Sequence, residues 1–229
     1  MLSKKNKPGL NSRHHNIRTL FITAWRLPIL TTDLEKLGIY DGINEIIAVT
    51  TNKSKTANAA PIGLYKHKHK HDLQIHLYQN KTRENLEHIE YLTANITQDP
   101  ILIVTSALST LPQETYTEIE YQQQKYPVLK NASTSILLKV KQQNETTFTL
   151  QPLTGAAKKQ TARAINRGFF AVIEATVYAT RYVLFHGKEQ LRSIKYYNTI
   201  VNKCGSPAEI EAMNILCQLC NIELDSSLL

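Results

Sequence analysis

The spacing of apolar residues changes once along this 229-residue chain, and that change constrains the fold more than any single motif. Before about residue 150, apolar residues form short runs rich in β-branched side chains and separated by turn signals, which is typical of strands. After about residue 155 they recur with helical spacing over longer segments. We expect strands over 43–51, 58–65, 72–78, 101–105, 135–142 and 146–151, and helices over 162–185, 188–204 and from 207. Strands followed by helices predict an α+β fold.

Local signals refine this prediction. Pro61 lies inside the second strand and cannot donate to a ladder, so that strand is an edge or is bulged there. A turn at Asn144-Glu145 would join the last two strands. The Tyr- and Gln-rich connection over 107–131 is expected to hold a short helix over 115–123. Thr82 is a good N-cap for a helix that would carry one face of Leu86, Ile89, Leu92 and Thr93.

The formal net charge of +8 invites a nucleic-acid-binding hypothesis, but its distribution argues against one. Residues 1–30 hold six basic residues and no acid, so the other 199 residues carry only +2. No run approaches the roughly 20 apolar residues of a membrane span. We therefore expect a cytoplasmic protein with no nucleic-acid or membrane partner. The basic, acid-poor start is also compatible with a mitochondrial-type presequence.

Cysteines and histidines suggest metal or redox chemistry only weakly. Cys217 and Cys220 form a C-x-x-C pair inside an apolar helical pattern, where small buried core residues are the better interpretation. Three alternating histidines, His67, His69 and His71, are interspersed with lysines between two predicted strands, which favours a solvated hairpin tip over a metal site. We predict no metal.

One strand segment has the properties of a flavin-binding surface. Small side chains and a proline-broken ladder expose backbone amides and allow a flat ligand to approach closely. A flavin ring needs N–H donors along one edge and an apolar wall. A β-bulge at a barrel rim would explain the segment equally well when it is taken alone. The segment comprises Asn58, Ala59, Ala60, Pro61, Ile62 and Gly63.

A second segment, residues 78–85, has the properties of a phosphate site. A strand ends near Tyr78 and a helix begins near Lys81, so free N–H groups and positive dipole would meet there. Thr82 and Asn85 add neutral donors, and Lys81 or Arg83 adds charge for a dianion. An ordinary capped surface helix is the alternative.

Together, the two segments resemble the flavin reductase-like FMN-binding split barrels. Further motifs are similar to one uncharacterised FMN-binding family of that class, of the domain of unknown function 447 type, within the flavin reductase-like and pyridoxamine-phosphate-oxidase-like superfamily. The resemblance covers roughly residues 38–225. The motifs that narrow it are Asp41-Gly42-Ile43-Asn44-Glu45-Ile46-Ile47, Asn95-Ile96-Thr97-x-Asp99-Pro100, and Asn166-Arg167-Gly168 through Ile173-Glu174-Ala175 to Ala179-Thr180-Arg181.

The resemblance implies a split β-barrel over 38–153 with a helical region over 154–229, after a basic extension over 1–37. It also implies an FMN-dependent homodimer with the flavin in a groove at the subunit interface. The segment from Asn58 to Gly63 would line the ring, and Lys81, Thr82 and Asn85 would hold the phosphate, beside Tyr78. Arg167, at a helix start, is a further candidate for an anionic ligand.

The predicted function is an FMN-dependent oxidoreductase acting on a small molecule. Reduced nicotinamide, a second flavin and a pterin-type carbon carrier all remain open as substrates. A flavin-binding module without catalysis is the alternative, and a nucleic-acid binder is the third hypothesis. Glu174, Tyr178 and Arg181 share a helix face, where an ion-pair network is favoured over a direct role at the flavin.

Overall fold

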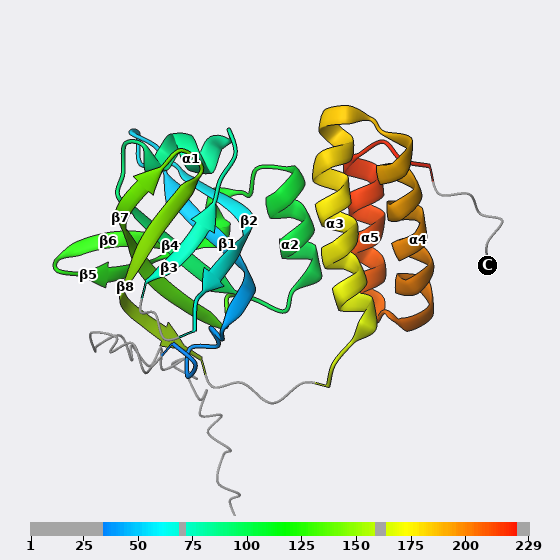
Figure 1. Ribbon diagram of the computed structural model, residues 1–229. Coiled ribbons are helices and arrows are strands. Elements are labelled where there is room, and N and C mark those ends of the chain that lie inside the picture. Colours follow the sequence, from blue (N-terminus) through cyan, green and yellow to red (C-terminus); the bar gives the residue numbers. More distant parts are fainter. Residues whose placement is uncertain (1–33, 69–71, 159–163, 224–229) are drawn as a thin grey trace, which may run out of the picture.

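Six antiparallel strands close into a barrel, and helices cover one side of it (Figure 1). The computed structural model describes residues 34–68, 72–158 and 164–223. The barrel order is β1-β2-β3-β8-β7-β4. Five of the predicted strands are present in the structure. The barrel strands are β1 (Gly42–Thr51), β2 (Ala57–Lys66), β3 (Leu73–His76), β4 (Tyr91–Ile96), β7 (Thr134–Asn144) and β8 (Thr147–Ala157).

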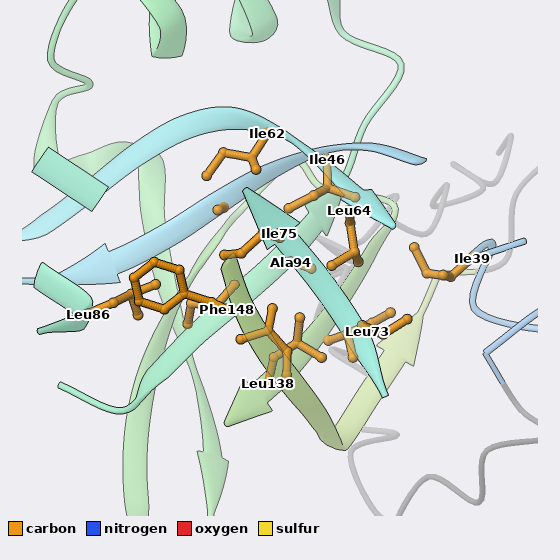
Figure 2. Close-up of a cluster of buried hydrophobic side chains, with 14 of the residues drawn as sticks. Ile39, Ile46, Ile62, Leu64, Leu73, Ile75, Leu86, Ala94, Leu138 and Phe148 are labelled. Atoms are coloured by element: carbon orange, nitrogen blue, oxygen red, sulfur yellow. The ribbon is translucent and has the colours of Figure 1, made fainter. Parts of the chain in front are cut away.

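The barrel interior is an aliphatic core with one large aromatic ring. Phe148 of β8 is fully buried, and Leu86 of the short helix α1 (Lys81–Leu86) belongs to the same cluster at one end of the barrel (Figure 2). Alternate residues of each strand point inward, as the period of 2 requires. The strands contribute Ile46, Ala48, Leu64, Leu73, Ile75, Leu92, Ala94, Ile136 and Leu138.

β2 is only partly paired on its second edge. It pairs with β1 along its whole length, but with β3 only from Leu64 to Lys66. The stretch from Ala57 to Gly63, which contains Pro61, therefore has a sheet partner on one side only within the described chain. The edge predicted from Pro61 is confirmed, because a residue without an N–H leaves one side of the strand poorly suited to pairing.

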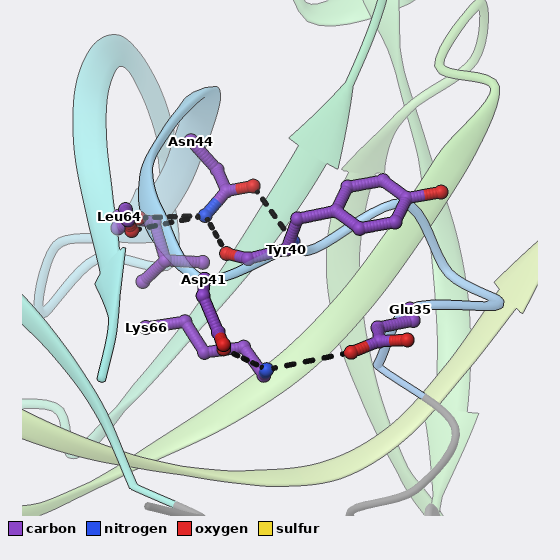
Figure 3. A network of polar contacts seen from close by, with 7 residues as sticks. Glu35, Tyr40, Asp41, Asn44, Leu64 and Lys66 are labelled. Carbon is purple, nitrogen blue, oxygen red and sulfur yellow. Dashed lines mark hydrogen bonds and ion pairs between the residues drawn. The ribbon is translucent and has the colours of Figure 1, made fainter. Parts of the chain in front are cut away.

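A polar cluster fixes the entry to β1. Gly42 has a φ of +106°, which other residues rarely adopt, so the turn requires glycine. The Asn44 amide donates to the main-chain oxygens of Tyr40 (2.8 Å) and Leu64 (3.2 Å). Lys66 of β2 pairs with Asp41 and lies 3.8 Å from Glu35 (Figure 3). These contacts hold the start of β1 against the end of β2.

The helical region is attached to the barrel through α2 (Pro100–Leu108), which lies between them (Figure 1). The core of this region combines residues of α2, α3 (Arg167–Phe185), α4 (Lys188–Cys204) and α5 (Pro207–Leu219). A capping box of Ser206 and Glu209 starts α5. Gly168 allows the start of α3 to touch the turn between α4 and α5, because a Cβ there would lie 2.5 Å from the Cα of Gly205.

The predicted strand over 101–105 is wrong, because this segment is helix α2. The Asp99 side chain accepts hydrogen bonds from the N–H groups of Ile101 and Leu102, and Pro100 occupies the first turn. A short apolar run is compatible with either a buried strand or a buried helix. The N-cap residue Asp99 was the signal that distinguishes the two.

Two predicted helical segments are strands. The connection over 115–123 was expected to be helical, but it forms a hairpin of β5 (Tyr116–Tyr121) and β6 (Gln124–Leu129), with a one-turn helix, η2 (Gln113–Thr115), before it. Gln122 and Gln123 both have positive φ, as a tight hairpin turn needs. The helix at Thr82 ends at Leu86, so Leu92 and Thr93 lie on β4, and its N-cap is Asn80.

Replacing Asn95 by alanine should destabilise the fold by about 3 kcal/mol. Asn95 is fully buried, donates to the Ile47 carbonyl (3.2 Å), and accepts from Leu129 N–H (3.1 Å) and Ser135 Oγ (2.8 Å). It thereby joins four strands, and its loss leaves buried partners unsatisfied. Urea unfolding would measure the change. Asn214→Ala, at an exposed position of α5, should change the free energy of unfolding little.

Candidate functional site

The candidate site is built on the outer face of β1 and β2. Residues of the two strands face each other in register, and alternate pairs point away from the barrel core. We call this surface the outer face of β1–β2. It comprises the pairs Val49 and Ala59, Ile47 and Pro61, and Glu45 and Gly63.

The predicted ring-binding segment divides between two faces. Ala59, Pro61 and Gly63 lie on the outer face of β1–β2, whereas Ile62 is buried in the barrel core and Ala60 packs against it. Asn58 pairs with Thr50, on the inward-facing side. Half of the segment can therefore meet a flat ligand with its side chains, and the unpaired β2 edge adds main-chain donors and acceptors.

The predicted phosphate segment lies beside the same strand pair. The Asn80 side chain caps α1 by accepting from Arg83 N–H (2.9 Å). The N–H groups of Lys81 and Thr82 lie in the first turn of the helix and have no carbonyl acceptor within it. They can therefore donate to a ligand. Thr82 is only 1% exposed, whereas Lys81 is exposed. The helix start therefore offers two amides and one ammonium group.

Thr50 links the two predicted segments, and the sequence did not single it out. Asn85 is buried, and its amide donates to Thr50 Oγ1 (2.9 Å). Thr50 is in turn the ladder partner of Asn58. The structure therefore brings Asn58, Thr82 and Asn85 to one end of the barrel. A threonine at the end of a β-branched strand carries no distinctive signal, so only the tertiary contact identifies it.

Tyr78 and Arg83 surround this junction differently. Tyr78 is highly exposed just before α1 and has its whole ring available at the surface. Arg83 lies 3.4 Å from Glu87, one helical turn later. That carboxylate offsets its charge, so Lys81 is the better of the two cations for an added anion.

A narrow cavity of about 40 Å³ separates the outer face of β1–β2 from α2 and α3. It includes Pro61 from the predicted ring-binding segment, but not Lys81, Thr82 or Asn85. Its walls are mostly apolar, with a few polar groups that could orient a ligand. The lining consists of Glu45, Ile46, Ile47, Pro61, Asn95, Thr97, Ile103, Ile173, Thr176 and Val177.

Glu45 is the ionisable group of this cavity. Partial burial raises the pKa of Glu45, and the nearby negative charge of Glu174 on α3 raises that pKa further. The ion-pair network predicted for Glu174 is wrong: Glu174 is exposed, and no ion pair within the described chain includes it. Arg181 instead stacks over the Tyr178 ring, 5.9 Å from its centroid.

Arg167 lies apart from the other predicted residues within one protomer. It is exposed at the first turn of α3, beside a surface hollow lined by Ile165, Asn166 and Cys204. Helix α3 begins at the lower end of the helical region, whereas α1 lies across the opposite end of the barrel (Figure 1). The structure does not bring Arg167 and Lys81 together in one chain.

The C-x-x-C pair is structural. Cys217 and Cys220 are both buried in the helical core. Burial, and then the neighbouring Cys220, raises the pKa of Cys217 to about 11, so the thiol stays protonated at neutral pH. Among residues 34–68, 72–158 and 164–223 no group of three potential metal ligands occurs. His67 bonds Gln74, and the predicted tip residues His69 and His71 lie outside the described residues.

Comparison with known proteins agrees with this architecture. A family model described as the N-terminal domain of a protein of unknown function (DUF447) matches residues 44–159. A second DUF447 model matches residues 166–218. An FMN-bound DUF447 protein from Methanosarcina mazei is 34% identical, with a TM-score of 0.75 over 82% of this chain and 100% of that chain.

Two other solved structures are more distant. An FMN-binding domain of a flavin reductase-like enzyme from Shewanella baltica is 12% identical, with a TM-score of 0.44 over 57% of this chain and 76% of that one. Flavoredoxin of Desulfovibrio vulgaris is 11% identical, with a TM-score of 0.43 over 62% and 76%.

Fold and site together define an α+β protein with a closed six-stranded barrel and a C-terminal helical region. The predicted fold class is therefore confirmed. Within that class, the chain belongs to the DUF447 family.

Proposed function

We propose that this protein is an FMN-dependent oxidoreductase that works as a homodimer in the cytoplasm. The observation that carries the proposal is the convergence of two independent features on one strand pair. A partly unpaired β2 edge with small outward residues lies beside a helix start with free N–H groups and an exposed lysine. FMN is the cofactor predicted from the sequence, and the family member from M. mazei is FMN-bound.

The residues present fit FMN chemically. Lys81 and the first amides of α1 suit a phosphate dianion, because a helix N-terminus favours negative charge. Pro61 and Gly63 leave room for a ring to approach the β2 backbone. Thr50 and Asn85 hold the helix start against the strand pair, so the phosphate donors and the ring surface keep a fixed separation.

An oxidoreductase follows from what the protein groups lack. The outer face of β1–β2 supplies apolar surface, main-chain groups and one carboxyl, which can position a ring but cannot accept or donate electrons. When bound, FMN supplies hydride or single-electron transfer. The protein would orient the ring, exclude water from it and provide protons.

A homodimer is supported by the exposed face of α3. Phe170, Val177 and Leu184 are exposed apolar residues spaced seven apart, so they form one stripe along the helix. The opposite face, with Ala171, Ala175 and Ala179, is buried in the helical core. By length and composition α3 alone among the described helices could cross a membrane, and only 33% of it is buried. Because Val177 also lines the cavity, a second copy on this stripe would border the candidate site.

The substitution Lys81→Ala should weaken FMN binding by about 1.5–3 kcal/mol, the worth of one charge-assisted bond, and leave riboflavin binding unchanged. Riboflavin has the same ring without the phosphate. Flavin fluorescence quenching would measure both affinities. Lys188→Ala, at the exposed first residue of α4, is the matched control. Equal losses for both ligands would contradict the phosphate assignment, and a wild-type protein that binds no FMN would contradict the function.

Anaerobic reduction distinguishes an enzyme from a flavin carrier. A reduced nicotinamide should bleach the visible absorbance of the FMN-loaded protein, and an added electron acceptor should restore it through repeated cycles. Stopped-flow absorbance would follow both half-reactions. Bound FMN that neither reduced nicotinamide, reduced flavin nor a reduced pterin bleaches would favour the non-catalytic carrier instead.

Leu184→Glu should convert a dimer to a monomer, because it places a charge within the proposed apolar contact. Sedimentation velocity would measure the change. Leu219→Glu introduces the same charge at an exposed leucine of α5 and should leave the dimer intact. A wild-type protein that sediments as a monomer would rule out this interface.

A further inference from the structure

We propose that Glu45 is the proton donor for a substrate bound at the outer face of β1–β2. This inference rests on the proposed flavin function. Glu45 belongs to β1, lines the cavity, and lies directly across the ladder from Gly63 of the predicted ring-binding segment.

Gly63 keeps the carboxyl accessible from that segment. A Cβ at residue 63 would lie 3.9 Å from Glu45 Oε1 and only 2.9 Å from Cγ2 of Ile43. A side chain there would therefore crowd the strip between the carboxyl and the β2 backbone. With glycine, no side chain of residue 63 occupies the space beside Glu45 Oε1.

Glu45 also differs from four other acids around the barrel, which have lysine partners. The barrel and its hairpins place Asp41 with Lys66, Asp72 with Lys141, Glu90 with Lys139 and Glu118 with Lys125. No ion pair within the described chain includes Glu45. An acid that makes no structural ion pair, placed in a cavity, is a candidate for proton transfer.

The surrounding groups favour its protonated form. Helix α2 carries no titratable side chain. Helix α3 contributes Glu174, whose charge acts both on Glu45 and on Tyr197 of α4. Partial burial and the Glu174 charge both raise the pKa of Glu45, so it holds its proton to a higher pH than an ordinary glutamate. Two cations lie seven residues from Glu174 on that helix: Arg167 is exposed at the helix start, and Arg181 stacks on Tyr178.

The proton would move from the Glu45 carboxyl to a basic oxygen or nitrogen of the acceptor. The acceptor also gains a hydride from the reduced cofactor, which is thereby oxidised by two electrons. The Glu45 carboxylate then recovers its proton from water, so charge and hydrogen balance. The negative charge of Glu174 disfavours an anionic ligand beside Glu45, so the substrate class is a neutral or cationic carbonyl, imine or quinone.

A carbon-13 NMR titration of glutamate carboxyls in the full chain tests the proton-holding step without any turnover. Glu45→Gln identifies the resonance. We expect Glu45 to titrate above the ordinary value for a glutamate, and Glu174→Gln to lower its midpoint. Glu211→Gln, at an exposed position of α5, should leave that midpoint unchanged. A Glu45 midpoint at the ordinary value, or one that ignores Glu174→Gln, would overturn the inference.

Two acceptors separate proton delivery from electron transfer in the FMN-loaded, reduced protein. A quinone needs protons to complete its reduction, whereas ferricyanide needs electrons alone. Glu45→Gln should slow reoxidation by the quinone by about 10²-fold and leave ferricyanide unaffected. Equal rates with the quinone, in a variant that retains FMN, overturn the role of Glu45. Failure of the wild-type protein to bind FMN would instead count against the proposed function.

Discussion

Pro61 has no amide hydrogen to give to a neighbouring strand, and the arrangement of the barrel around β2 depends on that lack. From Ala57 to Gly63 the strand is held by β1 alone, so β3 joins it only at its far end. The barrel is therefore closed by a short contact and open along one edge. The open edge is where the small outward residues of β2 lie, and where helix α1 is attached through Asn85 and Thr50.

The outer face of β1–β2 is covered by helices only in part. Val49 and Ala59 pack into a cluster with Ile103 of α2, whereas Glu45 and Gly63, further along the same strands, remain beyond that cluster. The cavity marks the boundary between the two parts. A single strand pair thus carries both a packed contact, which attaches the helical region, and a surface that a ligand could occupy.

Sequence periodicity predicted the α+β class, five of the barrel strands and the three C-terminal helices, because each has a long or regular apolar pattern. It failed where a local signal competed with that pattern. The run Ile101–Thr105 is equally apolar as strand or helix, and only the Asp99 cap decides between them. Leu92 and Thr93 fit a helical face after Leu86, but their pairing with β1 and β7 determines the strand.

The sequence predicted which residue types belong to the candidate site better than it predicted how they are arranged. The segments around Pro61 and Thr82 could be found from residue types, because each type has a chemical use. Thr50 and Glu45 could not, since their importance arises from partners about 35 and 130 residues away in sequence. Likewise, the isolation of Glu174 from any basic partner is a tertiary property, and helical spacing alone suggested the opposite.

The contact between Gly168 and Gly205 has a consequence for the distant cavity. The two glycines let the start of α3 rest on the residue that precedes α5, and Asn166 and Glu209 bond across the same point (3.2 Å). Helix α3 then runs as one unbroken rod to Ile173 and Thr176, which form a wall of the cavity. The N-terminal end of α3 is therefore fixed in position. Because the cavity wall lies about two helical turns along the same helix, the distance between the backbones of Gly168 and Gly205 determines how far that wall lies from Glu45.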